Sequence, residues 1–367
     1  MKRLDLYIIR KFLGTFFLSI VLVMSLAIVF DLTEKMDDFF ENQVSFREIV
    51  VDYYFNFIPY YMNMFAPLFI FISVIFFTSK LAGNSEIIAM LAAGVSFHRI
   101  MLPYLFSATL LFGLFYYMGG YIIPPANGKL LDFEDKYIKK FKSDNARNIQ
   151  MVVEPGTILY IETFQKRHNS GYRASLDKFE DKHLTSRIVA ERIYFDGVDT
   201  DPQTGAKNPK WHFENYTRRE FDGLKESISI GQRLDTVIPM VPDELFITAE
   251  QAQQMTNPEL SHYIEKQRER GTGDIQAFET ELHKRYASPI AAFIMTLLAV
   301  TLSSRKVRGG MGKNLGIGIT LSAMYILFST VSTTFSVSGV MSPFMSVWLP
   351  NFIFLAIGIV LYTRAPK

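Results

Sequence analysis

The stretch YFNFIPYYMNMFAPLFIFISVIFFT, residues 54–78, contains no charged side chain. A helix needs about 20 apolar residues to cross a hydrocarbon core roughly 30 Å thick, so this run is long enough for one membrane span. Composition agrees, because 49% of the 367 residues are hydrophobic and 14% are aromatic. These proportions are high for a soluble protein of this length. The chain is therefore expected to fold in a membrane.

Further uncharged runs occur on both sides of this stretch, at 12–30, 101–126, 286–304 and 314–363. The last run is too long for one span, and SVSGVMSP at 336–343, with Gly339 and Pro343, predicts a turn between two helices. The sequence thus predicts six spans. A signal peptide is the competing interpretation of residues 1–30, but no small-residue cleavage motif follows the apolar run, so we expect an uncleaved span.

Lysine and arginine are unevenly distributed among the short connections. They gather at the N-terminus, at 79–100, after residue 304 and in the C-terminal tail. The alternate connections, 31–53 and 336–343, hold only Lys35 and Arg47. Because basic residues near span ends stay preferentially in the cytoplasm, both termini and the 79–100 connection are expected there.

Most charged residues lie between the third and fourth runs. Segments such as ILYIETF (158–164), RIVAERIYF (187–195) and KWHFENY (210–216) alternate apolar and polar residues, as half-buried strands do. We expect a periplasmic antiparallel domain, a sandwich or a jelly-roll-like sheet, inserted into a membrane α-helical protein. Beyond it, Asn257 can cap a helix that begins at Pro258 and ends at Gly271. The expected divisions are 1–126 for three spans, 127–255 for the β domain, 256–285 for a helical connection and 286–367 for three more spans.

Motifs for catalysis are not found. The chain has no cysteine, its six histidines lack the HxxxH spacing of a metal site, and there is no G-x-S-x-G elbow. The loop GGMGKN (309–314) has Val307 where a phosphate loop needs glycine and Asn314 where it needs serine or threonine. The uncharged runs also lack the ionisable residues that ion-driven carriers use. We expect no enzyme activity, metal or cofactor, and no nucleic acid partner at a net charge of +2; energy for any transport would come from a partner.

The connection NSEIIAMLAAGVSFHRI (84–100) predicts a short helix over 84–94. Asn84 can cap it, Glu86 lies in its first turn, and Gly94 can end it. One interpretation is a helix lying along the membrane surface. The other is a docking helix whose apolar side chains fill a groove on a cytoplasmic protein while Glu86 meets a basic group.

Several segments of the chain resemble those of a known family. The pattern SEIIAMLAAGVS (85–96) is similar to the cytoplasmic coupling helix of the LptF/LptG (YjgP/YjgQ) lipopolysaccharide export permeases. Further similar segments are LDLYIIRKF (4–12), ELSHYIEKQRERG (259–271), ELHKRYASPIA (281–291) and WLPN (348–351). Their order and spacing extend the resemblance across nearly the whole chain.

The resemblance implies a permease subunit of an ABC-type transporter in the inner membrane of a Gram-negative bacterium, serving outer membrane biogenesis. Two copies of the ATPase LptB would bind beneath this chain and a homologous LptF or LptG permease. Lipopolysaccharide would pass to a periplasmic β-jelly-roll joined with those of LptC and LptA. By the same resemblance, Glu86 matches the acid that meets the ATPase, with Ile87, Met90 and Leu91 beside it.

Lipid contacts are expected at two places. A lipid that leaves the bilayer exposes its acyl chains to water, at a cost of about 0.8 kcal/mol per CH₂. An apolar slot in the β domain would shield these chains. Candidate slot residues are Ile158, Tyr160, Ile161, Ile188, Val189, Ile193, Phe195, Trp211 and Phe213, which are alternatively the core of the sheet. Lys35 and then Arg47 are the candidates for the anionic head group. Alternatively, Lys35 only offsets nearby acids, and residues 12–30 lack the basic residue that some family members carry there.

The sequence is also compatible with two other functions. A related machine could carry another lipid or a lipoprotein. A membrane sensor or scaffold could instead bind a periplasmic ligand with its β domain and signal through the 84–94 helix. A permease requires an ATPase at Glu86, whereas a sensor does not.

Overall fold

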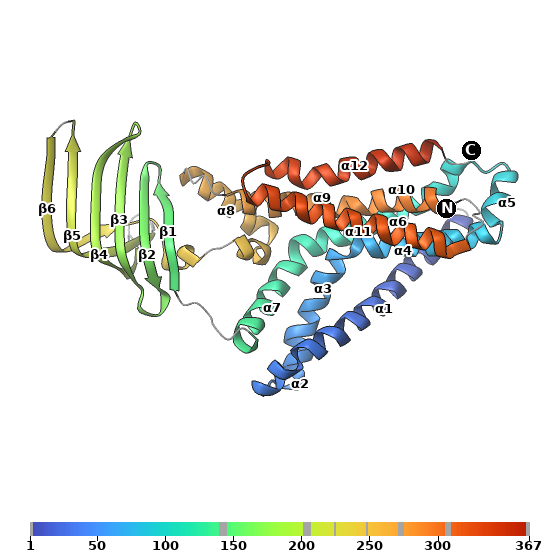
Figure 1. Ribbon diagram of the computed structural model, residues 1–367, viewed down its shortest axis with the longest axis horizontal. Coiled ribbons are helices and arrows are strands. Elements are labelled where there is room, and N and C mark those ends of the chain that lie inside the picture. The colour runs from blue at the N-terminus through green and yellow to red at the C-terminus, as the bar shows by residue number, and fades with distance from the viewer. Residues whose placement is uncertain are drawn as a thin grey trace. The chain divides into compact units, whose positions relative to one another are not determined.

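The computed structural model describes residues 3–138, 145–200, 207–223, 225–246, 249–270, 275–304 and 310–364. The chain divides into two compact units: unit 1 is Met1–Lys140, Ala252–Leu260 and Gln276–Lys367, and unit 2 is Phe141–Gln251 and Ser261–Ile275. Helices build unit 1 and a β-sheet builds most of unit 2 (Figure 1). The predicted insertion of a β domain into a membrane α-helical protein is confirmed.

Unit 1 is built from helices. Before the insertion they are α1 (Arg3–Glu41), α2 (Phe46–Glu48), the π-helical η1 (Ile49–Tyr54), α3 (Phe55–Met64), α4 (Ala66–Gly83), α5 (Glu86–Ala92), α6 (Phe97–Tyr117), η2 (Met118–Ile122) and α7 (Ile123–Tyr137). After it they are α9 (Gln276–Ala287), η6 (Ser288–Ile290), α10 (Ala291–Ser303), α11 (Gly310–Val337) and α12 (Pro343–Thr363). Six helical stretches in the described residues are long and apolar enough to cross a membrane, as predicted.

The first span is much longer than its uncharged run. At 1.5 Å per residue, the 39 residues of α1 extend roughly 58 Å, almost twice the hydrocarbon thickness. The helix continues past residue 30 because apolar side chains still recur on one face. Phe39, 5% exposed, packs against Tyr53 and Phe133 with ring centroids 5.8 and 6.1 Å away. The connection predicted at 31–53 is therefore largely helical.

The run at 54–78 is split at Phe65, which leaves helical geometry with φ −94° and ψ 7°. Pro67 stands in the first turn of the restarted helix α4, where its missing N–H is tolerated. In α4, 72% of the most apolar window is buried, against 22% in α1 and in α11. A Cβ on Gly318 of α11 would overlap Ile75 and Phe71, so α11 approaches α4 closely. α4 is the central helix of unit 1.

The last three helices follow the predicted order. α11 ends at Val337 and α12 begins at Pro343, with Ser342 accepting a hydrogen bond from the Met345 N–H at 3.4 Å. The turn expected at 336–343 lies between them, with Gly339 at φ +78°. The fourth span is interrupted by η6, since Pro289 cannot continue the hydrogen-bond ladder.

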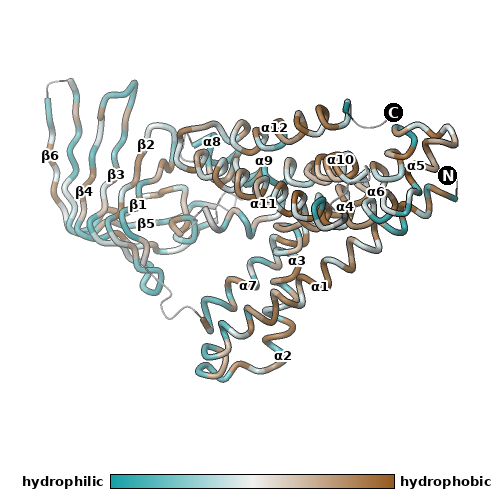
Figure 2. Tube along the Cα trace, turned by 45° about the vertical axis from the view of Figure 1, so that its right-hand side comes forward, coloured by the Kyte–Doolittle hydropathy of each residue, from teal (hydrophilic) through white to brown (hydrophobic). Residues whose placement is uncertain are grey.

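The sheet of unit 2 has six antiparallel strands in the order β1-β2-β3-β4-β5-β6. They are β1 (Asn145–Glu154), β2 (Thr157–Gln165), β3 (Ser170–Glu180), β4 (His183–Thr200), β5 (Lys207–Asp222) and β6 (Lys225–Val237). Each described strand pairs with its neighbours in sequence, so the sheet is a meander with edges at β1 and β6. Figure 2 shows hydrophobic stretches along the helices and alternating hydropathy along the strands.

One face of the sheet carries the core of unit 2. Ile161, Ile193, Trp211 and Phe213 are each 0% exposed, and the Trp211 indole donates to the Met240 carbonyl at 3.0 Å. The chain then forms η4 (Pro242–Phe246), η5 (Ala249–Gln254) and α8 (Asn257–Arg270). α8 confirms the predicted helix, but it already includes Asn257, so the prediction that Asn257 caps it is wrong. Gly271 lies outside the described residues.

Candidate functional site

The short helix predicted over 84–94 is present as α5, Glu86–Ala92. Its first cap is Ser85, held at φ +61°, and no side chain caps the helix. The prediction that Asn84 caps it is wrong, because Asn84 ends α4 instead. Asn84 Nδ2 donates to Glu86 Oε1 at 3.1 Å, which holds the carboxylate at the start of α5.

The end of α5 is closed by a two-bond turn. The Gly94 N–H donates to the Leu91 carbonyl at 3.0 Å and the Val95 N–H donates to the Met90 carbonyl at 3.1 Å. This pair of bonds is the Schellman arrangement, which needs a left-handed residue, and Gly94 supplies it at φ +83°. The predicted stop at Gly94 is confirmed.

The apolar residues of α5 divide between two faces. Ile87 is 2% exposed and packs into the core of unit 1, and Met90 and Leu91 are half-buried against the same core. Ile88 is 51% exposed. The helix is therefore anchored by Ile87 and presents Ile88 outward, with Glu86 half-exposed beside it.

The helices around α5 are joined by polar contacts. Arg99, in the first turn of α6, donates to Asp5 of α1 at 2.7 Å, and Asp5 is 5% exposed. His98 Nδ1 lies 3.2 Å from the Tyr362 hydroxyl of α12. These contacts fix three spans at the end of the bundle that carries α5.

Lys35 lies in a polar cluster between α1, η1 and α7. Its ammonium is 3.2 Å from Asp31 and 3.4 Å from Glu134, and it also donates to the Tyr53 hydroxyl. Burial, followed by the Asp31 carboxylate, raises the pKa of Tyr53 far above its usual value, so Tyr53 stays neutral. The charge of Lys35 is thus balanced inside the chain. Arg47 is exposed and forms no ion pair with the described residues.

The candidate slot residues lie on two faces of the sheet. Ile193, Trp211 and Phe213 belong to the core face, whereas Ile158 and Tyr160 alternate with the buried Leu159 on β2 and are half-buried on the opposite face. Alternation with period two places neighbouring strand residues on opposite faces. The accessible margin of the core consists of half-buried apolar side chains: Ile149, Met151, Leu176, Phe195, Tyr216, Leu234 and Phe246.

Strands β4, β5 and β6 bring together a cluster of metal-ligand-type side chains that the spacing in the sequence did not indicate. Asp196, His212 and Asp235 bring ligand-type atoms within 4.8 Å of one another. His212 Nδ1 is 2.6 Å from Asp196, and Arg233 contacts Asp196 at 3.5 Å and Asp235 at 2.9 Å. Because Arg233 already offsets both carboxylates, we assign no metal to this group. Only strand register brings these residues together, and the sequence does not specify register.

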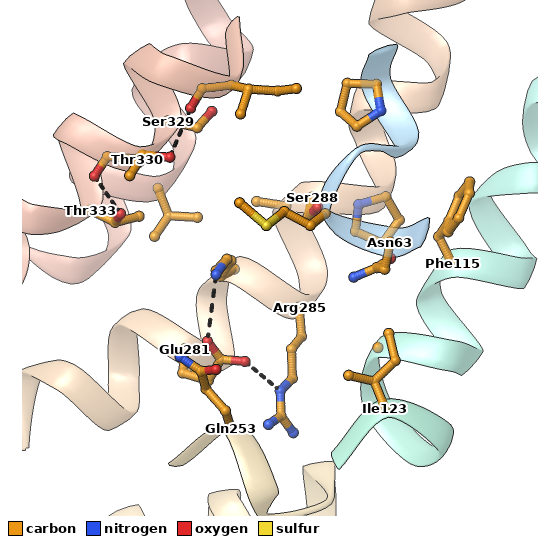
Figure 3. Close-up of a pocket in the computed structure, with 18 of the residues that line it drawn as sticks. Asn63, Phe115, Ile123, Gln253, Glu281, Arg285, Ser288, Ser329, Thr330 and Thr333 are labelled. Atoms are coloured by element: carbon orange, nitrogen blue, oxygen red, sulfur yellow. Dashed lines mark hydrogen bonds and ion pairs between the residues drawn. The ribbon is translucent and has the colours of Figure 1, made fainter. Parts of the chain in front are cut away.

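A pocket of about 300 Å³ lies among the helices of unit 1. Figure 3 shows Ser329, Thr330 and Thr333 of α11 on one side and Phe115 and Ile123 on the other. Apolar lining also comes from α3, α4, α9, η6, α11 and α12: Met64, Pro67, Ala287, Pro289, Ile326 and Val347. Sequence reasoning missed this pocket, although ELHKRYASPIA and WLPN both contribute to its wall.

One end of the pocket is charged. Arg285, 6% exposed, pairs with Glu281 at 3.1 Å and also donates to the carbonyls of Met255 at 2.6 Å and Ala252 at 2.8 Å and to Asn257 at 3.1 Å. These bonds hold residues 252–257, the segment that returns the chain to the helices. We call this set of bonds the Arg285 clamp.

The other polar wall joins α11, α12 and α9. The Tyr325 hydroxyl donates to Asn351 Oδ1 at 2.7 Å, and Asn351 Nδ2 donates to the Ala287 carbonyl at 2.9 Å. Asn351, 3% exposed, thereby satisfies a carbonyl at the η6 interruption of the fourth span.

Six membrane-capable helices with an inserted antiparallel sheet define a multi-pass membrane protein with a large extramembrane insertion. Comparison with protein-family models matches residues 6–364 to the lipopolysaccharide export system permease LptF/LptG. The chain belongs to this family, as its motifs predicted. A permease of this family is the membrane subunit of a transporter and is not itself an enzyme. No curated protein matches the chain.

Proposed function

We propose that this protein is the permease subunit of an ATP-driven complex that extracts lipopolysaccharide from the inner membrane and passes it to a periplasmic β-sheet bridge toward the outer membrane. The observation that carries the proposal is the family match over residues 6–364, on a chain with six spans and one inserted sheet. The chain has no phosphate-loop motif of its own, so ATP would be hydrolysed by a partner.

The proposed ATPase contact is α5, meeting one of two LptB copies. Glu86 is half-exposed and forms no ion pair within the described residues, so its charge is available to a basic group on a partner. Ile88 and the exposed parts of Met90 and Leu91 would provide the apolar contact. Ile87 would act indirectly, by anchoring the helix to unit 1.

The proposed second permease, an LptF or LptG homologue, would cover α1 and α11. Only 22% of the most apolar window of each is buried by the chain itself. Large side chains such as Phe17, Leu22 and Leu327 are 49%, 61% and 64% exposed. These faces are available to lipid, to the second permease and to the lipopolysaccharide that would pass between the two.

The proposed bridge to LptC and LptA uses the edges of the sheet. An edge strand offers unpaired N–H and C=O groups to which another strand can add. Among the described strands β6 pairs only with β5, and Ile230 is 80% exposed on it. Acyl chains would enter along the half-buried margin of the core and meet Ile193, Trp211 and Phe213 beneath it.

For the head group we favour Arg47 over Lys35, which reverses the order expected from sequence. Arg47 is exposed and unpaired in the described chain, whereas the ammonium of Lys35 contacts Asp31 and Glu134. Lys35 would reach an anionic sugar phosphate only by giving up these contacts.

The test is co-purification with a charge-reversal control. The tagged protein is extracted from native membranes in mild detergent and its partners are identified by mass spectrometry. We expect a soluble ATPase and a second six-span homologue with the wild type. The Glu86→Lys variant should lose the ATPase. Glu34 is an exposed acid near the C-terminal end of α1, away from α5, and the Glu34→Lys variant should retain the ATPase.

Two outcomes would contradict the proposal. A folded wild-type protein that co-purifies with neither partner would oppose the transporter assignment altogether. A Glu86→Lys variant that retains the ATPase and normal lipopolysaccharide export would remove α5 as the contact.

A further inference from the structure

The connection between α1 and α3 carries the two most exposed phenylalanines of the described residues. Phe40, in the last turn of α1, is 76% exposed, and Phe46, at the start of α2, is 81% exposed. The residues between them, ENQVS at 41–45, are mostly polar. We call residues 40–48 the tip. Two large apolar rings on a polar segment indicate a surface that something else covers.

The tip lies where the chain turns back toward the membrane. α1 is long and apolar enough to cross a membrane, and the uncharged run of the next span begins at residue 54. Figure 1 shows α2 at the end of unit 1 opposite α5, where the turn between α11 and α12 also lies. The tip is therefore at the membrane boundary opposite α5.

The length of α1 determines how deep the tip lies. Its 39 residues extend roughly 58 Å, whereas a bilayer with its head groups is about 40–45 Å thick. A tilt of about 40° fits the whole helix into this thickness, and spans longer than the hydrocarbon core do tilt. Figure 1 shows α1 inclined to α12 and diverging from it toward α2. At this tilt Phe40 and Phe46 lie among the lipid head groups rather than in the water above them.

The exposed apolar face of α1 continues into the tip. Five side chains at spacings of three, four or seven residues share one face and are each at least 40% exposed: Leu22, Leu26, Val29, Met36 and Phe40. Because this end of α1 diverges from α12, a protein beside the span would have to follow it outward, whereas lipid fills the space without specific contacts. The bilayer is therefore the partner that best fits this face.

Hydrogen bonds join the tip to the end of α7. Asn42 Nδ2 donates to the Tyr137 carbonyl at 2.7 Å, and the Tyr137 hydroxyl donates to Glu48 Oε1 at 2.9 Å. Ser45 caps α2 and donates to Glu48 Oε2 at 2.7 Å. The bonds from Ser45 and Tyr137 hold the pKa of Glu48 below its usual value, so Glu48 remains an ionised acceptor at neutral pH. Since α7 ends at Tyr137, the position of the tip determines where the chain leaves for the insertion.

We propose that the tip is a membrane-surface anchor, in which the rings of Phe40 and Phe46 insert between lipid head groups. The bonds of Asn42 and Glu48 then hold the end of α7 at that surface. Interfacial helices bind membranes in this way, with apolar side chains about 5–10 Å deep in the head-group region. The anchor is independent of the ATPase and of the exported lipid, so its test stands apart from that of the proposed function.

Spin labels measure the environment of the tip directly, because the chain has no cysteine of its own. The full-length protein is placed in nanodiscs of phosphatidylethanolamine and phosphatidylglycerol without lipopolysaccharide. Labels at Phe40→Cys and Phe46→Cys should be more accessible to oxygen, which concentrates in lipid, than to a water-soluble nickel chelate. Ile353→Cys, 40% exposed in the middle of α12, is the lipid reference, and the exposed Lys225→Cys of β6 is the water reference.

Two outcomes would overturn the anchor. Greater accessibility to the nickel chelate at both phenylalanine positions would place the tip in water. An immobilised label that neither reagent reaches would show that a protein, such as a second copy of this chain, covers the tip. Arg47→Cys, the next residue around α2, should face the nickel chelate even when Phe46→Cys does not.

Amide hydrogen exchange in the same nanodiscs tests the hold on α7. The double variant Phe40→Ser/Phe46→Ser should exchange the amides of residues 134–138 about fivefold faster than the wild type, because the end of α7 loses its fixed support. Phe106→Ser, which removes a phenylalanine 48% exposed in α6, should leave this exchange unchanged. Equal exchange in the double variant and the wild type would overturn the link between the tip and α7.

Discussion

Arg285 carries a permanent charge into a position that is 6% exposed. Burying a guanidinium costs several kcal/mol unless its donors are satisfied, and here one carboxylate, two carbonyls and one amide oxygen accept them. The position also depends on Asn257, which is itself 6% exposed. Side-chain bonds from Arg285 thereby hold residues 252–257, where η5 ends and α8 begins.

The side chain of Asn257 packs directly against Gly120. A Cβ at Gly120 would lie 2.5 Å from Asn257 Nδ2, so Gly120→Ala should push this amide away from Arg285. We expect a loss of roughly 1–3 kcal/mol, typical of overpacking, seen as a lower midpoint of thermal unfolding in detergent. Gly119→Ala, one residue earlier in the same helix and facing open space, should leave the midpoint unchanged. Equal midpoints for the two variants would show that Asn257 can move without cost.

At the scale of elements, α5 depends on its final turn. Gly94 has φ +83°, a conformation that costs other residues about 1–2 kcal/mol. Gly94→Ala should loosen the Schellman turn and increase amide hydrogen exchange in residues 86–92 about fivefold or more. If α5 is the ATPase contact, the same variant should also weaken co-purification of the ATPase.

Gly83 provides the control for that prediction. A Cβ at Gly83, as at Gly94, meets no atom within 4 Å, but Gly83 lies in α4 and lacks a positive φ. Gly83→Ala should therefore leave exchange in α5 unchanged. Faster exchange in both variants would mean that any added side chain disturbs the connection, independent of backbone conformation.

The start of α8 makes a pH-dependent contribution. Glu259 Oε2 accepts hydrogen bonds from the Thr256 N–H and hydroxyl, both at 2.8 Å, and these bonds hold the pKa of Glu259 below its usual value of 4.5. The predicted cap, Asn257, instead serves Arg285. Because the carboxyl pKa is depressed in the folded state, the stabilisation is present above pH 4.5 and is lost as the pH falls through the folded value.

Comparison of unfolding midpoints across pH tests this contribution. Glu259→Gln should lower the midpoint at pH 7, and its difference from the wild type should shrink as the pH falls below 4.5. Glu265→Gln, on the exposed side of the same helix, should show no such pH-dependent difference. A Glu259→Gln difference that stays constant with pH would assign the effect to side-chain shape rather than charge.

At the scale of the whole molecule, local sequence patterns predicted most of the architecture. Uncharged runs predicted six spans, and period-two segments predicted the inserted sheet, because both signals lie within local sequence. Residues brought together from distant segments were not predictable. Lys35 meets Glu134, the pocket joins Asn63 to Asn351, and strand register joins Asp196 to Asp235. No local pattern encodes these contacts, and they determine which candidate residues are available to a ligand.

Membrane orientation is the last property of the whole chain that basic residues predict. The chain has no cysteine, so each introduced cysteine is a unique label site. Arg47→Cys and Val340→Cys, the latter at a position 75% exposed, should react with a membrane-impermeant maleimide in intact spheroplasts. Ala93→Cys, at the exposed end of α5, should react only after permeabilisation, because the excess of lysine and arginine near it favours the cytoplasm. Labelling of Ala93→Cys from outside, with Arg47→Cys protected, would invert the topology and rule out a cytoplasmic ATPase at α5.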